Sequence, residues 1–354
     1  MASRPVIALD ATYSVDTALS GVGVYSREIM WGLAEAHPEA KFNWCYRPHK
    51  ILRSLADRFP RNASRKLLHY GKQPPKGSVF HALNQRVETE GGARLTPIVT
   101  TFHDLFVMTG DYSTPDFRKR FTDQALRAAE RSDCIIAVSA FTAEQVKALL
   151  NPDVPVHVVH HGVYTPSAPP PGDADRENII LHVGSIQKRK NLIRLIQAFE
   201  ALENPEWRLV LAGSPKGFGA EEVLEAAKAS TAAARIEITG YLEPADLEAL
   251  YRKARIFAFP SLDEGFGIPV IEAMAAGVPV ITSDGSALHE VAGESAVLIE
   301  PNRTDSLVEA VRALVAAPGL RNQLRQAGYQ RAKEFPWSKA IKGTWDCYQS
   351  VIRR

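Results

Sequence analysis

The chain contains few cysteines and no long apolar run. Cys45, Cys134 and Cys347 are widely spaced and include no C-x-x-C pair, so the sequence indicates neither a disulfide framework nor a cysteine zinc site. No segment approaches the ~18 uninterrupted apolar residues of a membrane-spanning helix. The first residues run directly into an expected strand rather than into a signal peptide. We therefore expect a cytoplasmic protein, and a position at the inner face of the membrane stays open.

Signatures of several other protein classes are also missing. The sequence has no G-x-S-x-G or H-E-x-x-H motif that would indicate a hydrolase. It has no helix-turn-helix, zinc-finger or RNA-recognition signature, so we expect no nucleic-acid partner. A D-x-D pattern, Asp173-Ala174-Asp175, lies in a proline-rich stretch away from the expected sheets, and we interpret it as a coincidence. We expect no metal and no cofactor.

The positive charge of the chain is concentrated in one segment. The net formal charge is only +2, yet residues 41–76 contain ten Lys or Arg residues against the single acid Asp57. Trp44, Tyr46 and other aromatic residues are interleaved with these cations. Such a pattern suits peripheral contact with an anionic membrane or a phosphate-bearing acceptor, and a merely solvated basic face is an equal alternative.

Length and patterning indicate two α/β domains. A chain of 354 residues, 45% of them apolar, is long enough for two cores. Apolar runs alternate with helical patterns, which is typical of a parallel sheet, so we expect two doubly wound Rossmann-like domains that face a cleft. The proline-rich stretch 166–176 is interpreted as a linker. The expected strands lie at 6–9, 98–101, 134–138 and 156–159 before this linker and at 179–183, 208–212, 236–239, 256–259, 278–282 and 296–299 after it.

The stretch 261–281 carries the strongest signal for a binding site. An apolar strand ends shortly before Glu264, and Pro269 suits the first turn of a helix, where its missing N–H costs nothing. Glu272 then lies about one turn into that helix, so both carboxylates can border a pocket above the carboxyl end of the strand. Gly265 and Gly267 allow close backbone approach, and the helix start suits a phosphate. Two acids beside a phosphate site indicate a sugar nucleotide; two solvated surface glutamates are the alternative.

A second candidate loop follows the first strand of the second domain. Ser185 leads into Lys188-Arg189-Lys190 and then Asn191, before a helix expected over 192–202. Three adjacent cations at the carboxyl end of a strand can neutralise a diphosphate, whereas a basic loop elsewhere would be solvated surface.

Two further candidates lie in the N-terminal domain. Gly21 and Gly23 lie between the first strand and an amphipathic helix, where small residues permit close approach of a ligand, and a tight start of the helix explains them equally well. His103 ends an expected strand beside Asp104, and this position makes a functional histidine and an ordinary core or surface residue equal alternatives.

Together these motifs resemble one family. The stretch 261–281 and the Lys190 loop are similar to the signature of retaining GT-B glycosyltransferases, in the large bacterial family (glycosyl transferases group 1) of mannosyl- and glucosyltransferases that use nucleotide-sugar donors. The resemblance spans nearly the whole chain. It implies an acceptor-binding domain over 1–165, a linker over 166–176, a nucleotide-sugar-binding domain over 177–337, and a terminal helix over 338–354 that crosses back to the first domain.

The resemblance also implies roles for individual residues. Arg189 and Lys190 would stabilise the leaving nucleoside diphosphate, Glu264 would hold sugar hydroxyls, and Glu272 would hold the ribose. His103 would contact the sugar from the opposite wall of the cleft, and the backbone at Tyr241 would meet the nucleobase. The remaining donor-binding positions would be Gly21, Gly23, Ser185, Gly265, Phe266, Gly267 and Ile268.

The donor and the mechanism follow from smaller features. Ser185 stands where many family members carry an arginine, and this resembles the mannosyltransferases, so we expect transfer of mannose from GDP-mannose to a glycan or lipid-linked acceptor. A UDP-sugar such as UDP-glucose is the alternative donor. No carboxylate is evident on the reacting face of the sugar, which favours front-face substitution with the donor phosphate taking the acceptor proton. A sugar-nucleotide epimerase and a non-catalytic sugar-nucleotide-binding module are the alternative functions.

Overall fold

The computed structural model describes residues 4–69, 72, 75–87, 96–166 and 170–352. The chain forms two units, each with its own sheet. The first unit contains most of the chain up to Gly162 together with the C-terminal segment that begins at Trp337, and the second contains Val163–Pro336. The C-terminal helix therefore belongs to the first unit, as predicted.

The first unit is a parallel sheet covered by helices. Its strands are β1 (Val6–Asp10), β2 (Lys41–Tyr46), β3 (Ala63–Leu67), β4 (Val79–Ala82), β5 (Ile98–Phe102), β6 (Cys134–Ala137) and β7 (Val156–Val158). Its helices are α1 (Gly21–Ala36), α2 (Phe106–Thr109), α3 (Pro115–Arg131), α4 (Ala140–Leu150) and α12 (Trp337–Ile352). In the described part of this unit the seven strands are ordered β3-β2-β1-β4-β5-β6-β7.

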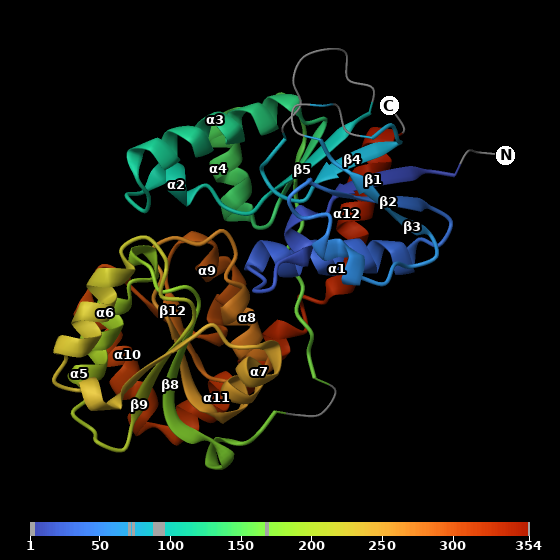
Figure 1. Ribbon diagram of the computed structural model, residues 1–354. Coiled ribbons are helices and arrows are strands. Elements are labelled where there is room, and N and C mark those ends of the chain that lie inside the picture. Colours follow the sequence, from blue (N-terminus) through green and yellow to red (C-terminus); the bar gives the residue numbers. More distant parts are fainter. Residues whose placement is uncertain (1–3, 70–71, 73–74, 88–95, 167–169, 353–354) are drawn as a thin grey trace. The chain divides into compact units, whose positions relative to one another are not determined.

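Side-chain alternation along the strands creates one apolar core on each face of this sheet. In β1, Ile7 and Leu9 pack into the core under α1 and α12, whereas Ala8 packs into the core under α3 and α4. Figure 1 shows these two pairs of helices on opposite faces of the sheet. The strands are apolar on both faces because both faces are covered, and this explains why they appear as continuous apolar runs in the sequence.

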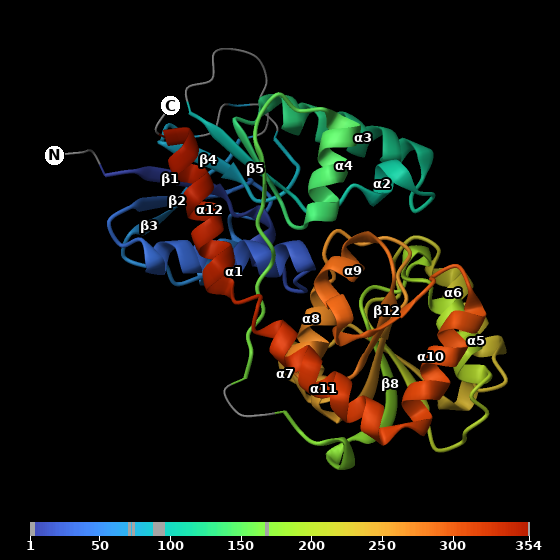
Figure 2. The same ribbon diagram turned by 180° about the vertical axis from the view of Figure 1, so that it is seen from behind.

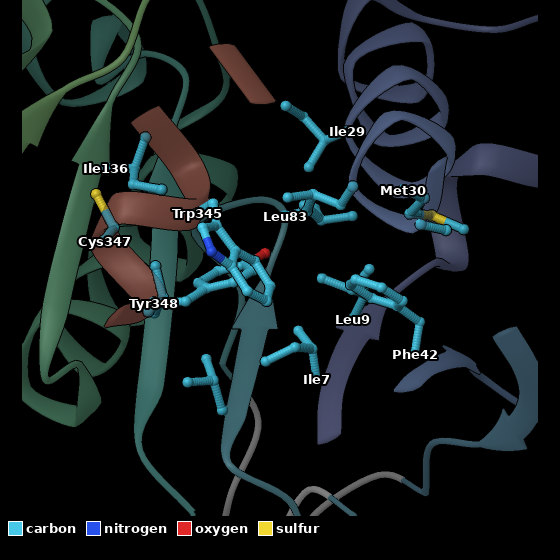
Figure 3. Packing of buried hydrophobic residues seen from close by; sticks show 14 of the residues in the cluster. Ile7, Leu9, Ile29, Met30, Phe42, Leu83, Ile136, Trp345, Cys347 and Tyr348 are labelled. Atoms are coloured by element: carbon cyan, nitrogen blue, oxygen red, sulfur yellow. The ribbon is translucent and has the colours of Figure 1, made fainter. Parts of the chain in front are cut away.

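Helix α12 is fixed to the first sheet by apolar packing and by a buried chain of hydrogen bonds. Figure 2 shows the helix lying along this sheet, and Figure 3 shows Trp345 and Tyr348 within the apolar cluster. The Tyr348 hydroxyl lies 2.7 Å from Nδ1 of His81, and Nε2 of His81 lies 2.8 Å from the Thr101 hydroxyl. Tyr25 of α1 bonds to the same Thr101 hydroxyl at 3.0 Å. The chain of bonds thus joins α12, the centre of the sheet and α1.

The second unit repeats the same architecture. Its strands are β8 (Glu177–Val183), β9 (Arg208–Ala212), β10 (Ile236–Gly240), β11 (Ala254–Phe259), β12 (Val280–Ser283) and β13 (Val297–Ile299). Its helices are α5 (Leu192–Glu200), α6 (Ala220–Ala229), α7 (Pro244–Lys253), α8 (Ile268–Ala275), α9 (Ser286–Ala292), α10 (Thr304–Ala316) and α11 (Pro318–Ala332). Within the described residues, all six strands are parallel and are ordered β10-β9-β8-β11-β12-β13. Helices α5, α6 and α10 cover one face, and α7, α8 and α11 cover the other (Figure 1).

The basic segment 41–76 differs from its interpretation as an interfacial patch with interleaved aromatic residues. Trp44 and Tyr46 lie on β2 with no exposed surface, so they are core residues and cannot anchor the chain at a membrane. Arg47 is buried as well and forms an ion pair with Asp10 at 3.4 Å. The prediction of interfacial aromatic residues was therefore wrong, because a pattern of residue types does not show which side chains the fold buries.

The D-x-D pattern lies in a short 3-10 turn, Asp173–Asp175, that packs against the second unit. Arg321 donates two hydrogen bonds of 2.7 Å to the two carboxylate oxygens of Asp173, and these bonds hold the pKa of Asp173 below its ordinary value. The aspartate therefore ties the end of the stretch 166–176 to α11. Among the residues that the structure describes, no helix has both the length and the apolar composition needed to cross a membrane.

Candidate active site

The strand order of the second unit places two loops side by side. The chain leaves β8 toward β9 and β10 on one side and returns to β11 on the other side of β8. The carboxyl ends of β8 and β11 therefore form the topological switch point, where open parallel sheets bind ligands. The loop after β8 carries Arg189 and Lys190, and the loop after β11 carries Glu264. Two candidates from separate parts of the sequence thus meet at one edge of the sheet.

The loop after β8 is held in place by its own backbone. Residues Lys188–Lys190 form a 3-10 turn, and Asn191 after it has a φ of +59°, a left-handed conformation that asparagine tolerates well. The Asn191 amide donates to the carbonyls of Pro260 at 3.0 Å and Pro301 at 2.7 Å. These bonds fasten the cationic turn to the loops after β11 and β13, which fixes the backbone from which the two cations project.

Arg189 and Lys190 share one oxygen of Glu264. Nη1 of Arg189 and Nζ of Lys190 each lie 2.6 Å from Oε1 of Glu264, and all three side chains are buried. Burial alone would raise the pKa of Glu264, but the charges of Arg189 and Lys190 and the hydrogen bond from Lys190 lower it to about 2. The site therefore contains an ionised carboxylate between two cations at neutral pH.

Lys190 has two further neighbours, one of which the sequence interpretation missed. Its Nζ lies 4.4 Å from the ring centroid of Phe259, within the range of a cation–π interaction. His182, at the end of β8, has no exposed surface and donates from Nδ1 to the Ala258 carbonyl at 3.0 Å. Burial first, and then the charge of Lys190, lower the pKa of His182 to about 3, so its imidazole is neutral.

The tautomer of His182 follows from its bond to the carbonyl. Because Nδ1 carries the hydrogen, Nε2 is the ring's acceptor, and this atom lies without a hydrogen-bond partner among the described residues. A Cβ added at Gly184 would lie 3.6 Å from this Nε2 and 3.6 Å from Nζ of Lys190, so both atoms face the same small space. His182 is therefore a buried, neutral acceptor close to Lys190. The position of His182 at the end of the predicted strand 179–183 was the available signal.

The start of α8 explains the glycine that precedes it. Gly267 caps the helix with a φ of +103°, and a Cβ at this position would lie 2.6 Å from Cδ2 of Leu288. Pro269 lies in the first turn, as predicted. Phe266 is buried against Phe335, with ring centroids 5.8 Å apart, so its side chain supports the loop. The contact of Gly265, Phe266, Gly267 and Ile268 with a donor stays a prediction.

Glu272 lies one turn into α8 and bonds to a different partner from Glu264. The hydroxyl of Tyr251 on α7 donates to Oε2 of Glu272 at 3.1 Å. Burial raises the pKa of Glu272 to about 7, and the bond from Tyr251 offsets only part of this shift. The two glutamates of the motif therefore differ in charge state near neutral pH. Tyr251 was not a sequence candidate, because its contact with Glu272 depends on how α7 packs beside α8.

The two remaining candidates in this unit lie on neighbouring loops. Ser185 is exposed directly after β8 and Gly184. Tyr241 follows Gly240 at the end of β10, and its side chain is 44% exposed. Their contacts with a donor stay predictions.

His103 follows β5 in the first unit and is buried in an aromatic cluster. Its Nε2 donates to the Leu83 carbonyl at 2.8 Å, and its ring lies 4.8 Å from that of Tyr25 and 5.3 Å from that of His161. Burial lowers the pKa of His103 to about 4, so the imidazole is neutral with Nδ1 as its acceptor. The sequence interpretation assigned no role to His161, which stacks on His103. The predicted contact of His103 with a sugar stays a prediction.

The glycine loop before α1 has a packing explanation. Ser20 caps the helix by accepting a hydrogen bond from the Gly23 backbone at 3.3 Å. A Cβ at Gly23 would lie 2.9 Å from the Tyr13 carbonyl oxygen, so this residue must be small. Gly21 is the first residue of the helix and is exposed. Its role in donor binding, like that of Gly23, stays a prediction.

Comparisons with known proteins agree with this arrangement. The family model described as glycosyl transferases group 1 matches residues 167–331, and the model described as glycosyltransferase family 4 matches residues 22–166. O-antigen chain mannosyltransferase B of Escherichia coli is 26% identical over 375 residues, which cover 96% of this chain and 98% of the relative. The MMP alpha-(1->4)-mannosyltransferase of Mycolicibacterium hassiacum is 29% identical over 243 residues, which cover 66% of this chain and 58% of the relative.

A solved structure has the same fold across the full length. The sucrose-phosphate synthase from Thermosynechococcus elongatus superposes with a TM-score of 0.77 at 20% identity and covers 99% of this chain and 100% of that chain. Two parallel-sheet Rossmann-like domains and a cationic site at the switch point of the second define a GT-B glycosyltransferase. The chain belongs to the glycosyl transferases group 1 family.

Proposed function

We propose that the protein is a retaining glycosyltransferase that transfers a hexose, mannose from GDP-mannose, to a glycan or a lipid-linked acceptor. The observation that carries this proposal is the cluster of Arg189, Lys190 and Glu264 at the switch point of the second sheet. It provides cations for a diphosphate and a carboxylate for sugar hydroxyls within one buried site.

The two cations stabilise the negative charge that develops on the departing diphosphate. The Nζ of Lys190 has three donor hydrogens and the guanidinium of Arg189 has five. In this proposal both groups donate to phosphate oxygens of the bound donor while they hold Glu264. Charge stabilisation by fixed groups in a site of low dielectric constant is a large part of catalysis in group transfer. We propose that these side chains supply this stabilisation without a metal ion, so addition of EDTA is expected to leave the rate unchanged.

Glu264 acts as a hydrogen-bond acceptor rather than as a general base. A carboxylate with a pKa of about 2 holds a proton too weakly to remove one from an acceptor hydroxyl at neutral pH. The same charge makes it a strong acceptor for hydroxyl groups of the donor sugar. The proton of the acceptor hydroxyl is therefore assigned to the donor phosphate, in a front-face substitution that retains the anomeric configuration.

Glu272 binds the ribose of the donor in this proposal. Its pKa of about 7 means that an ionised and a protonated form coexist near neutral pH. Hydrogen bonds donated by ribose hydroxyls favour the ionised form, so donor binding is expected to release a proton from Glu272.

The choice of mannose rests on the relatives. Both O-antigen chain mannosyltransferase B, which this chain matches over nearly its whole length, and the MMP alpha-(1->4)-mannosyltransferase are mannosyltransferases by name. The first of them also supports a glycan acceptor. A UDP-sugar donor is the competing possibility, and a donor panel separates the two.

Peripheral contact with an anionic membrane is supported by the outer surface of the segment 41–76. Leu52 is 76% exposed and Leu55 is 63% exposed, and the exposed cations Arg58 and Arg61 follow them in the sequence. Apolar side chains beside cations suit a negatively charged lipid surface. We expect the protein to sediment with phosphatidylglycerol vesicles but not with phosphatidylcholine vesicles. The L52S/L55S variant should bind phosphatidylglycerol vesicles less strongly. Equal sedimentation of the protein with both lipids would contradict this part of the proposal.

The donor and the reaction can be tested in one series of incubations. The protein is mixed with GDP-mannose, UDP-glucose or UDP-galactose, with and without a mannose-terminated oligosaccharide, and the products are followed by NMR. Transfer from GDP-mannose with retention at the anomeric carbon is expected. Release of an altered free sugar without acceptor would indicate an epimerase, and no consumption of any donor would indicate a binding module.

A further inference from the structure

Two cysteines and a histidine that belong to none of the sites described above meet in the first unit. Cys134 lies on β6, His157 on β7 and Cys347 on α12. The two Sγ atoms and a ring nitrogen of His157 all lie within 4.8 Å of one another. Both cysteines are buried, whereas His157 is exposed. The sequence spacing gave no sign of this group, because its members come from three separate elements.

The strand register explains why these side chains meet. Ile136 of β6 pairs with His157 of β7, so the two side chains point to the same face of the sheet. Cys134 lies two residues before Ile136 and shares that face, because side chains alternate along a strand. Helix α12 covers this face and contributes Cys347, which Figure 3 shows in the same apolar cluster as Ile136.

The three ligand atoms are close to the spacing that a zinc ion requires. With bonds of about 2.3 Å to sulfur and about 2.1 Å to nitrogen, tetrahedral geometry separates neighbouring ligand atoms by roughly 3.5–4 Å. The observed atoms need to move by about 1 Å or less to reach that spacing. Such a change is within the reach of side-chain rotation.

The surroundings also suit this ion. Two thiolates neutralise the charge of Zn²⁺, so the occupied centre would be uncharged, as an apolar neighbourhood requires. Cys134 and Cys347 lie among buried apolar residues that include Ile136 and Val159. The exposed His157 connects the group to solvent, which provides a path for the ion and a water molecule as fourth ligand.

We propose that Cys134, Cys347 and His157 bind a Zn²⁺ ion that clamps α12 to the edge of the first sheet. The ion links a strand before the second unit to the helix after it, so it stabilises the return of the chain to the first unit. Its role is structural, and the transfer reaction does not depend on its chemistry.

The test uses the full-length protein, reduced and stripped of metal. Titration with Co²⁺, which replaces Zn²⁺ in such sites, is expected to produce a thiolate-to-cobalt charge-transfer band that saturates at one ion per chain. Addition of Zn²⁺ should remove this band and raise the melting temperature, because the ion binds only the folded chain.

Matched variants show whether these three residues are the ligands. H157Q changes an exposed side chain and is expected to fold, and both it and C347S should weaken binding at least about tenfold, since loss of even an outer-shell partner costs about 10–100-fold. C45A removes the third cysteine and H289Q removes an exposed histidine of the second unit; both should bind Co²⁺ as the unmodified chain does.

Three results would overturn the proposal. Absence of the band in the unmodified chain would show that the thiols are ordinary core residues. Equal binding in H157Q and the unmodified chain would place the ion elsewhere. A mass that shows a Cys134–Cys347 disulfide in protein purified without reductant, together with no Co²⁺ binding after reduction, would equally exclude the metal site.

Discussion

Replacement of Lys190 by methionine separates the catalytic role of this side chain from its structural one. Methionine keeps an unbranched chain of similar volume against Phe259 but removes the cation that lies 2.6 Å from Glu264. In this variant the Glu264 carboxylate still has Arg189 as a partner at 2.6 Å, so the charge of Glu264 stays paired. The variant should therefore fold, and the change isolates one of the two cations.

The expected magnitudes follow from these contacts. The loss of a buried hydrogen bond to a charged group costs about 1.5–3 kcal/mol of stability, less than the ~3–5 kcal/mol expected when a buried charge is left without a partner. Removal of a donor that stabilises charge in the transition state lowers kcat by about 10²–10³-fold. The effect on the rate should thus be clear while the protein is still folded.

The assay measures kcat, KM for the donor and the midpoint of chemical denaturation on the same preparation. Lys253→Met is the matched control, because Lys253 is an exposed lysine at the end of α7 with a surface ion pair to Glu177. It should behave as the unmodified enzyme does. A Lys190→Met enzyme with a kcat within about threefold of the control would refute the assignment of Lys190 to the leaving diphosphate.

The remaining predictions concern three other positions. The pKa of Glu272 is about 7, and donor binding favours its ionised form, so the affinity for a nucleoside diphosphate sugar should rise by up to about tenfold between pH 6 and pH 8. Glu272→Gln should flatten this pH dependence. A flat pH profile of the affinity in the unmodified enzyme would contradict the prediction. His182→Phe leaves a buried carbonyl without its donor and should lower the free energy of unfolding by about 1–3 kcal/mol; an unchanged denaturation midpoint would contradict this. A Cβ at Gly213 would lie 2.0 Å from the Gly184 carbonyl oxygen, so Gly213→Ala should lower the free energy of unfolding by about 3 kcal/mol. Gly319 is the control, because open space surrounds it: Gly319→Ala should leave the melting temperature unchanged or raise it.

Much of the fold could be predicted because buried parallel strands are continuous apolar runs. The prediction found β5, β6, β8 and β11, which are covered on both faces. It missed β2, β3 and β4. Strand β3 lies at the sheet edge and contains Ser64, Arg65 and Lys66, so it lacks the apolar pattern, and β2 was interpreted as part of a basic patch.

The site could be predicted only as far as local sequence determines it. Lys190 and Glu264 follow apolar runs and lie at the carboxyl ends of strands, so their loops could be placed at one edge of a sheet. The closeness of His182 to Lys190 and the hydrogen bond from Tyr251 to Glu272 depend on strand register and on the packing of neighbouring helices. The approach of Cys134 to Cys347 depends on the return of α12 to the first sheet. Such contacts have no signature in a single sequence.

The most direct test of the account is a calorimetric titration of the protein with GDP and then with UDP, repeated on the Lys190→Met variant. The account predicts that one of the two nucleotides binds the unmodified chain at one site, and that the variant binds it at least about tenfold more weakly, since a charged hydrogen bond to phosphate is worth about 1.5–3 kcal/mol. The absence of binding heat with both nucleotides, or equal affinity for the variant and the unmodified chain, would contradict a diphosphate site at the switch point of the second sheet.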